Sequence, residues 1–126
     1  MDREALIQEF ANDFVLNIDL VSRSYCGYWL RRVATLPNGA SIAWEQGESS
    51  DEVLVADEDG ERFARLYRKG SSPTLPKRFF IIDSAVARSA YEIGERLWGK
   101  NWMYEADANH YDVVMQRALL GVVRYG

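Results

Sequence analysis

Apolar residues recur at intervals of three and four in the C-terminal part of the chain, which predicts a helix between Asp107 and Gly121. The apolar stripe comprises Tyr111, Val114, Met115, Ala118 and Leu119. Asp107 or Asn109 suits the N-cap, because a side-chain oxygen there accepts a hydrogen bond from a free backbone N–H. After Gly121, the β-branched and aromatic residues of Val122–Tyr125 predict a short, buried strand that docks in a sheet.

Two further amphipathic helices are expected, one from Asp2 to about Ser22 and one over residues 84–98. The first carries the stripe Leu6, Phe10, Phe14, Ile18 and Val21. The second is capped by Asp83 or Ser84, ends at Gly99, and carries the stripe Val86, Ala90, Ile93 and Leu97. Both helices should cover a sheet.

The middle of the chain is rich in strand-forming residues. Ser24–Leu36 reads as a strand, followed by a turn at Pro37–Gly39 and a hairpin partner at Ser41–Trp44. Tyr25, Tyr28 and Trp29 do not alternate on one face, so either both faces are covered or a bulge near Gly27 re-aims one side chain.

A second hairpin is predicted from Val53–Ala56 and Arg62–Tyr67, because Asp59-Gly60 between two apolar runs is typical of a type I′ turn. Phe79–Ile82 is a central strand or an apolar lead into the following helix. We therefore expect one α+β domain over residues 1–126. It has an N-terminal helix, an antiparallel sheet of four or five strands, and two C-terminal helices packed on one face.

Composition supports a compact domain, since 48% of the 126 residues are hydrophobic and 13% are aromatic. No apolar run is long enough for a membrane span, and the first residues carry acids where a secretory signal carries bases, so a cytoplasmic location is expected. Cys26 and His110 are the single cysteine and the single histidine. Nothing in their spacing predicts a thiol–imidazole pair, and His110 near a helix start favours a cap. Phosphate-binding and hydrolase motifs are missing, so we expect no enzyme, no cofactor and no metal.

Charge is segregated along the chain. Eight acids and no base lie between Glu45 and Glu61, whereas residues 62–78 carry six bases and no acid. The simplest interpretation is cross-strand ion pairing across the Asp59-Gly60 hairpin. Alternatively, a row of carboxylates imitates a phosphate backbone, formed by Glu45, Glu48, Asp51 and Glu52.

The C-terminal pattern Asp112-Val113-x-x-Gln116-x-Ala118-Leu119-x-Gly121-x-Val123-x-Tyr125-Gly126 resembles the tail of small uncharacterised proteins encoded by bacteriophages. Tyr28-Trp29 is similar to an aromatic pair in the same group. Leu120 stands where an aromatic residue is expected, and Val122 where an acid is expected. The resemblance implies a phage or prophage product that works in a bacterial cytoplasm.

Two functions follow as hypotheses. The first is a non-enzymatic, anti-CRISPR-like accessory protein that binds and inhibits a host protein or ribonucleoprotein complex handling nucleic acid, through the acidic row. The second is a small-ligand or nucleotide-binding module that sequesters a signal. Its expected ligand-binding residues, for base stacking and for phosphate, are Tyr25, Tyr28, Trp29, Arg68 and Lys69. A two-fold homodimer is also expected, because a C-terminal strand at a sheet edge is readily hidden against a second copy.

Overall fold

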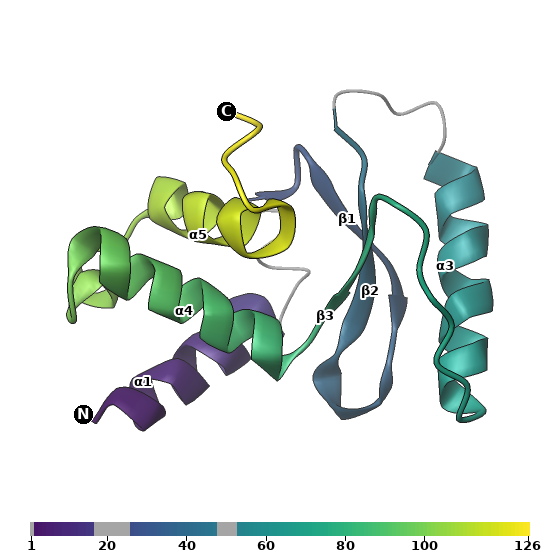
Figure 1. Ribbon diagram of the computed structural model, residues 1–126, viewed down its shortest axis with the longest axis horizontal. Coiled ribbons are helices and arrows are strands. Elements are labelled where there is room, and N and C mark those ends of the chain that lie inside the picture. Colours follow the sequence, from purple (N-terminus) through teal and green to yellow (C-terminus); the bar gives the residue numbers. More distant parts are fainter. Residues whose placement is uncertain (1, 17–25, 48–52) are drawn as a thin grey trace.

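The computed structural model describes residues 2–16, 26–47 and 53–126, and it has the expected mixed α+β class (Figure 1). The helices are α1 (Arg3–Phe10), α3 (Val53–Arg68), α4 (Ser84–Trp98) and α5 (Ala108–Leu120). The strands are β1 (Leu30–Thr35), β2 (Ser41–Glu45) and β3 (Phe79–Ile82). Short helical turns add η1 (Ala11–Val15), η3 (Pro37–Gly39) and η4 (Trp102–Tyr104).

The described strands form one antiparallel sheet in the order β1-β2-β3. The predicted hairpin is confirmed, with Arg31 opposite Trp44 and Thr35 opposite Ser41, but its first strand begins at Leu30 because residues 27–29 form turns. Its bulge, however, lies at Val33 and not near Gly27, because the register shifts between Arg32 and Ala34. Phe79–Ile82 forms a strand that pairs with β2 and occupies an edge of this sheet.

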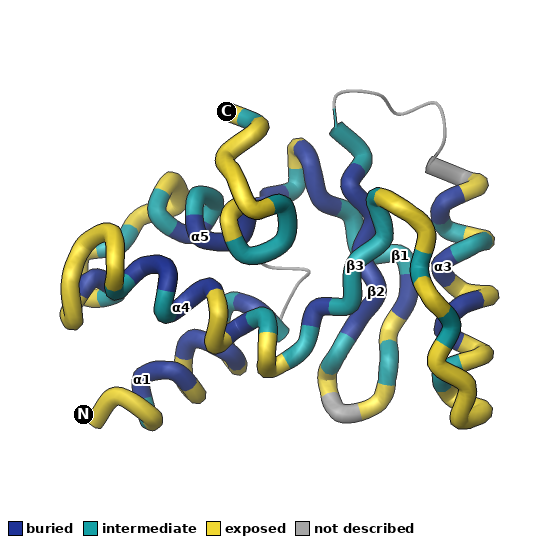
Figure 2. The backbone as a smooth tube through the Cα atoms, viewed as in Figure 1, coloured by how far each residue is buried: buried dark blue, intermediate teal, exposed yellow. Residues whose placement is uncertain are grey.

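Helices cover both faces of the sheet (Figure 1). On one side α3 packs on β1 and β2, whereas α1, α4 and α5 gather on the other side. Every residue of β2 is buried as a result (Figure 2). Ile42 belongs to the core beneath α3 and Ala43 to the core beneath the other helices, as expected from alternation along a strand.

The predicted second hairpin is wrong, because residues 53–68 form the continuous helix α3. Its buried positions Ala56, Gly60, Phe63 and Ala64 have helical spacing. Gly60 is not a turn residue. A Cβ atom there would lie 2.2 Å from Val33 Cγ2, so glycine allows α3 to approach β1 at the bulge.

This helix removes two of the expected strands, so the sheet that the structure describes has three strands and not four or five. Val122–Tyr125 is not a strand either, and Val122 and Val123 are exposed. The N-terminal helix is shorter than predicted: α1 ends at Phe10 and continues as a π-helical turn to Val15. Ile18, Val21 and the beginning of the predicted first strand lie outside the described residues.

The predicted boundaries of the last two helices are confirmed. Asp83 caps α4, with its side chain accepting a hydrogen bond from Val86 N. Asp107 caps α5, which ends at Gly121 in the left-handed conformation. Both helices lie on the face of the sheet that also carries α1, opposite α3.

Candidate functional site

A group of hydrogen-bonded polar side chains lies where α5 meets the segment before β1. The Asp112 carboxylate accepts hydrogen bonds from Tyr28 Oη and, at 2.8 Å, from Trp29 Nε1. Burial and the adjacent carboxylate raise the pKa of the Tyr28 hydroxyl. Asp112 and Gln116 are four residues apart, so α5 presents both from one side.

Gln116 holds the segment Val122–Gly126, which we call the tail. Its side chain is almost fully buried, and its Oε1 atom accepts hydrogen bonds from Arg124 N and Tyr125 N, both at 2.8 Å. Its Nε2 atom donates to Tyr125 O at 2.9 Å and to Asp112 Oδ1 at 3.2 Å. The backbone of the tail is therefore paired with a side chain of α5 and not with a strand.

Glu45 fixes the other side of the tail. Its carboxylate accepts hydrogen bonds from Arg124 Nη1 at 2.9 Å and from Tyr125 Oη, while the Tyr125 ring stacks on Trp29 with centroids 5.8 Å apart. Burial and then Glu45 raise the pKa of the Tyr125 hydroxyl. Glu45 is 6% exposed, so it belongs to this interior network and not to an exposed row of carboxylates.

This anchor network joins the segment before β1, the end of β2, α5 and the tail. Its members are Tyr28, Trp29, Glu45, Asp112, Gln116, Arg124 and Tyr125. Sequence reasoning singled out most of them, but it attached Glu45 to an acidic surface, and it considered Tyr28 and Trp29 either as core residues or, under the second hypothesis, as a stacking site. Trp29 is completely buried and Tyr28 is about half exposed, so Trp29 offers no free ring face.

Cys26 and His110 have different partners in the structure. Cys26 is fully buried, and its pKa is raised first by burial and then by the negative charge of Asp112, which favours the neutral thiol. His110 caps α5 instead. Its Nδ1 atom lies 2.9 Å from Asp107 Oδ1, and its ring meets Trp98 edge-on. The expectation that His110 serves as a cap is confirmed.

Most acids of α3 form ion pairs. Their partners are arginines of the same helix or of β1, and not residues across a hairpin as predicted. Asp57 binds Arg31 at 2.8 Å, and Glu61 binds Arg68 at 2.9 Å. Asp59 lies 3.3 Å from Arg62. Of the remaining expected site residues, Tyr25, Glu48, Asp51 and Glu52 lie outside the described residues.

The residues expected to hold phosphate are remote from Tyr28 and Trp29. Arg68 donates to Thr35 O at 3.0 Å, at the end of β1 opposite Leu30, and Lys69 follows it. Since strands rise about 3.3 Å per residue, the length of β1, roughly 17 Å, separates the two groups. They do not line a common pocket.

A pocket of about 480 Å³ that sequence reasoning missed lies beside the start of α5. Its lining residues are Trp98, Lys100, Asn101, Trp102, Tyr104, Glu105 and His110. Trp98 and Tyr104 are 40% and 65% exposed. A Cβ at Gly94 would lie 2.2 Å from Trp102 Cε2, so this glycine admits the buried indole. The concentration of aromatic residues between 98 and 104 was the available signal.

Comparisons of the chain with protein-family models, with curated proteins and with solved structures found no match. Within the described residues, no helix is long and apolar enough to cross a membrane. The same part of the chain holds no group of three or more side chains arranged to bind a metal ion. The resemblance to phage-encoded proteins therefore stays a prediction.

Proposed function

We propose that this chain is a non-enzymatic phage accessory protein that binds and inhibits a host nucleic-acid-handling defence complex, as an anti-CRISPR protein does. It would act in the cytoplasm of the bacterial host. The observation that supports this proposal is the stretch of eight acids without a base that leads into and along the first half of α3. A cationic channel built for nucleic acid attracts such a stretch electrostatically.

The structure narrows which acids are available for a partner. Glu45 is occupied in the anchor network, and the three acids of α3 that bind arginines contribute little net charge. Glu58 is exposed and has no ion pair with a described residue. We therefore assign the partner contact to Glu48, Asp51, Glu52 and Glu58.

Charge reversal tests this proposal. The variant Asp51→Lys/Glu52→Lys should lose binding to a purified CRISPR effector complex and should reduce the salt dependence of that binding. The control Glu9→Lys/Asp13→Lys makes the same change in net charge at exposed positions of α1 and η1. Equal losses in the two variants would show a net-charge effect only. If the wild-type protein neither binds nor inhibits such complexes, the proposal is wrong.

A small-ligand module is the second candidate function, and the 480 Å³ pocket supports it. Its volume lies within the range of roughly 300–1,000 Å³ that is usual for small-molecule sites. Exposed Trp98 offers a ring for stacking, and Lys100 offers a cation. A thermal-shift screen with nucleotides tests it: saturating ligand should stabilise wild type by roughly 2–3 kcal/mol and Trp98→Ala much less. No shift with any nucleotide would exclude nucleotides as ligands.

A further inference from the structure

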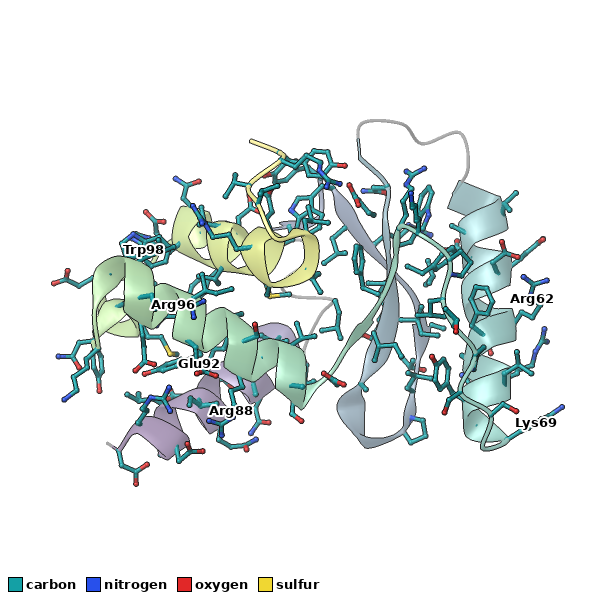
Figure 3. All side chains as sticks on the ribbon, in the orientation of Figure 1. Arg62, Lys69, Arg88, Glu92, Arg96 and Trp98 are labelled. Carbon is teal, nitrogen blue, oxygen red and sulfur yellow. The ribbon has the colours of Figure 1, made fainter. Side chains whose placement is uncertain are left out.

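A further pocket lies between α4 and α5, which run in opposite directions (Figure 1). It has a volume of about 190 Å³ and is lined by Ile93, Arg96, Leu97, Arg117 and Gly121. Arg96 and Arg117 are both exposed, and Figure 3 shows Arg96 on α4. The two cations come from different helices and share one pocket whose lining includes no acid.

Neither arginine has a carboxylate partner within the described part of the chain. Most other described arginines do, including Arg3, Arg31, Arg62, Arg68, Arg88 and Arg124. The neighbouring pockets of this surface also balance their cations: Glu105 lines the 480 Å³ pocket, and Asp2 and Glu95 line one beside α1. Two like charges in one pocket repel each other, so an anionic group placed between them is favourable.

Helix dipoles explain part of this arrangement, because each arginine lies in the last turn of its helix, where a cation is favourable. They do not explain the apolar surroundings. Leu97 is 42% exposed, and Val122 and Val123, which follow Gly121, are 56% and 45% exposed. Exposed apolar side chains beside arginines are typical of a protein–protein contact and not of an ordinary solvated surface.

The chemistry of the pocket favours a peptide over a free anion. Its volume is smaller than that of most small-molecule sites. The pocket also presents the apolar side chains of Ile93 and Leu97, which a free inorganic anion leaves uncovered. A polypeptide supplies a carboxylate and apolar side chains together.

We propose that the surface formed by Arg96, Arg117, Leu97 and the first residues of the tail docks an acidic, apolar segment of a partner protein. A carboxylate of that segment binds the two guanidinium groups, and an adjacent apolar side chain covers Leu97. This surface lies across the sheet from α3 (Figure 1), so it is separate from Glu58, the described residue of the proposed acidic contact.

Fluorescence anisotropy with labelled peptides tests this proposal. The probe is a short peptide of alternating glutamate and leucine, and the matched control replaces each glutamate by lysine. We expect the acidic peptide alone to bind wild type. Arg96→Gln/Arg117→Gln should weaken binding about tenfold, since each exposed pair contributes modestly. The control variant Arg65→Gln/Lys69→Gln removes two exposed cations of α3 and should leave binding unchanged.

Several outcomes would overturn the proposal. These are equal binding of both peptides, equal weakening in both variants, or complete competition by millimolar inorganic phosphate, which would identify a simple anion site. A further one is self-association that Arg96→Gln/Arg117→Gln abolishes, because the occupant would then be a second copy of this chain. Circular dichroism of both variants confirms that exposed substitutions leave the fold intact.

Discussion

The anchor network depends on Gln116 being neutral, which the substitution Gln116→Glu tests. The wild-type amide uses its oxygen for two N–H groups of the tail and its NH₂ group for Asp112 and Tyr125 O. Glutamate has the same shape and keeps the acceptor. The second carboxyl oxygen of the glutamate takes the position of Nε2, which lies 3.2 Å from Asp112 Oδ1, so two carboxyl groups face each other there.

The expected loss in the free energy of unfolding of Gln116→Glu depends on pH. Two unit charges about 4 Å apart repel by about 4 kcal/mol at an effective dielectric constant near 20, which corresponds to a pKa raised by roughly three units. In the folded variant one carboxyl therefore keeps its proton at pH 7. A protonated glutamate has one donor in place of the two of the amide, which costs about 1 kcal/mol. Near pH 4 the variant should lose only this amount.

The direction in which stability changes with pH follows from the difference between the folded and unfolded pKa values of the introduced carboxyl group. The folded pKa of the introduced carboxyl lies above its unfolded value of about 4.3, so stability is retained below that value and lost as the pH rises toward 7. The total loss at pH 7 should be about 5 kcal/mol relative to wild type. Urea unfolding of both proteins between pH 4 and pH 8 measures this difference.

Gln116→Met is the control, because it removes the same hydrogen bonds without adding a titrating group. Its loss of stability relative to wild type should not change over this pH range. If Gln116→Glu behaves like Gln116→Met, the carboxylate of Asp112 does not face this position as the structure shows.

Three further predictions concern packing, the thiol and assembly. Gly60→Ala should destabilise by about 1–2 kcal/mol, because overpacking against Val33 exceeds the gain of about 1 kcal/mol in helix propensity, and Val33→Ala in the same chain should relieve it. Cys26 should react slowly with iodoacetamide at pH 8 in the native protein and rapidly in urea, because its raised pKa keeps the thiol neutral; equal rates would contradict its burial. Because Val122–Tyr125 is not a strand, the predicted homodimer would have to pair through another sheet edge, such as β3. Light scattering that shows a monomer at roughly tens of micromolar would refute the homodimer.

The last two helices were predictable, because the apolar stripe and the capping residues of each helix indicate the same boundaries. Asp83 and Gly99 bracket one apolar stripe, and Asp107 and Gly121 bracket the other. The first hairpin was predictable for the same reason, since a turn signal separates two strand-forming runs. In each case local preference and tertiary packing favour the same structure.

The error at α3 has an identifiable cause. Asp-Gly between apolar runs is a strong local turn signal, but the positions that must be buried include Gly60 itself. Counting glycine as part of the apolar stripe reveals the helical period over Ala56, Gly60, Phe63 and Ala64. Sequence alone does not reveal that the bulge at Val33 makes this glycine a packing requirement.

The candidate site was harder to predict because its members interact across the fold. In the sequence, Glu45 is one of a series of acids. It is buried in the structure because Arg124 and Tyr125, from the C-terminal end of the chain, bind its carboxylate. The pocket at Arg96 and Arg117 likewise requires that α4 and α5 pack against each other. The spacing of residues within one segment does not show which distant segments it contacts in the fold.

The residues that carry the resemblance to phage-encoded proteins converge in space. Asp112, Gln116 and Tyr125 meet Tyr28 and Trp29 in one network, although about 80 positions separate the two sets. Its hydroxyl, amide and carboxylate groups bind one another, and Cys26 is fully buried. The pattern therefore describes how the tail is anchored. The anchored tail begins with exposed Val122 and Val123, which directly follow Gly121 in the lining of the pocket that holds the two arginines. The network that anchors the tail therefore also positions the first apolar residues of the proposed docking surface.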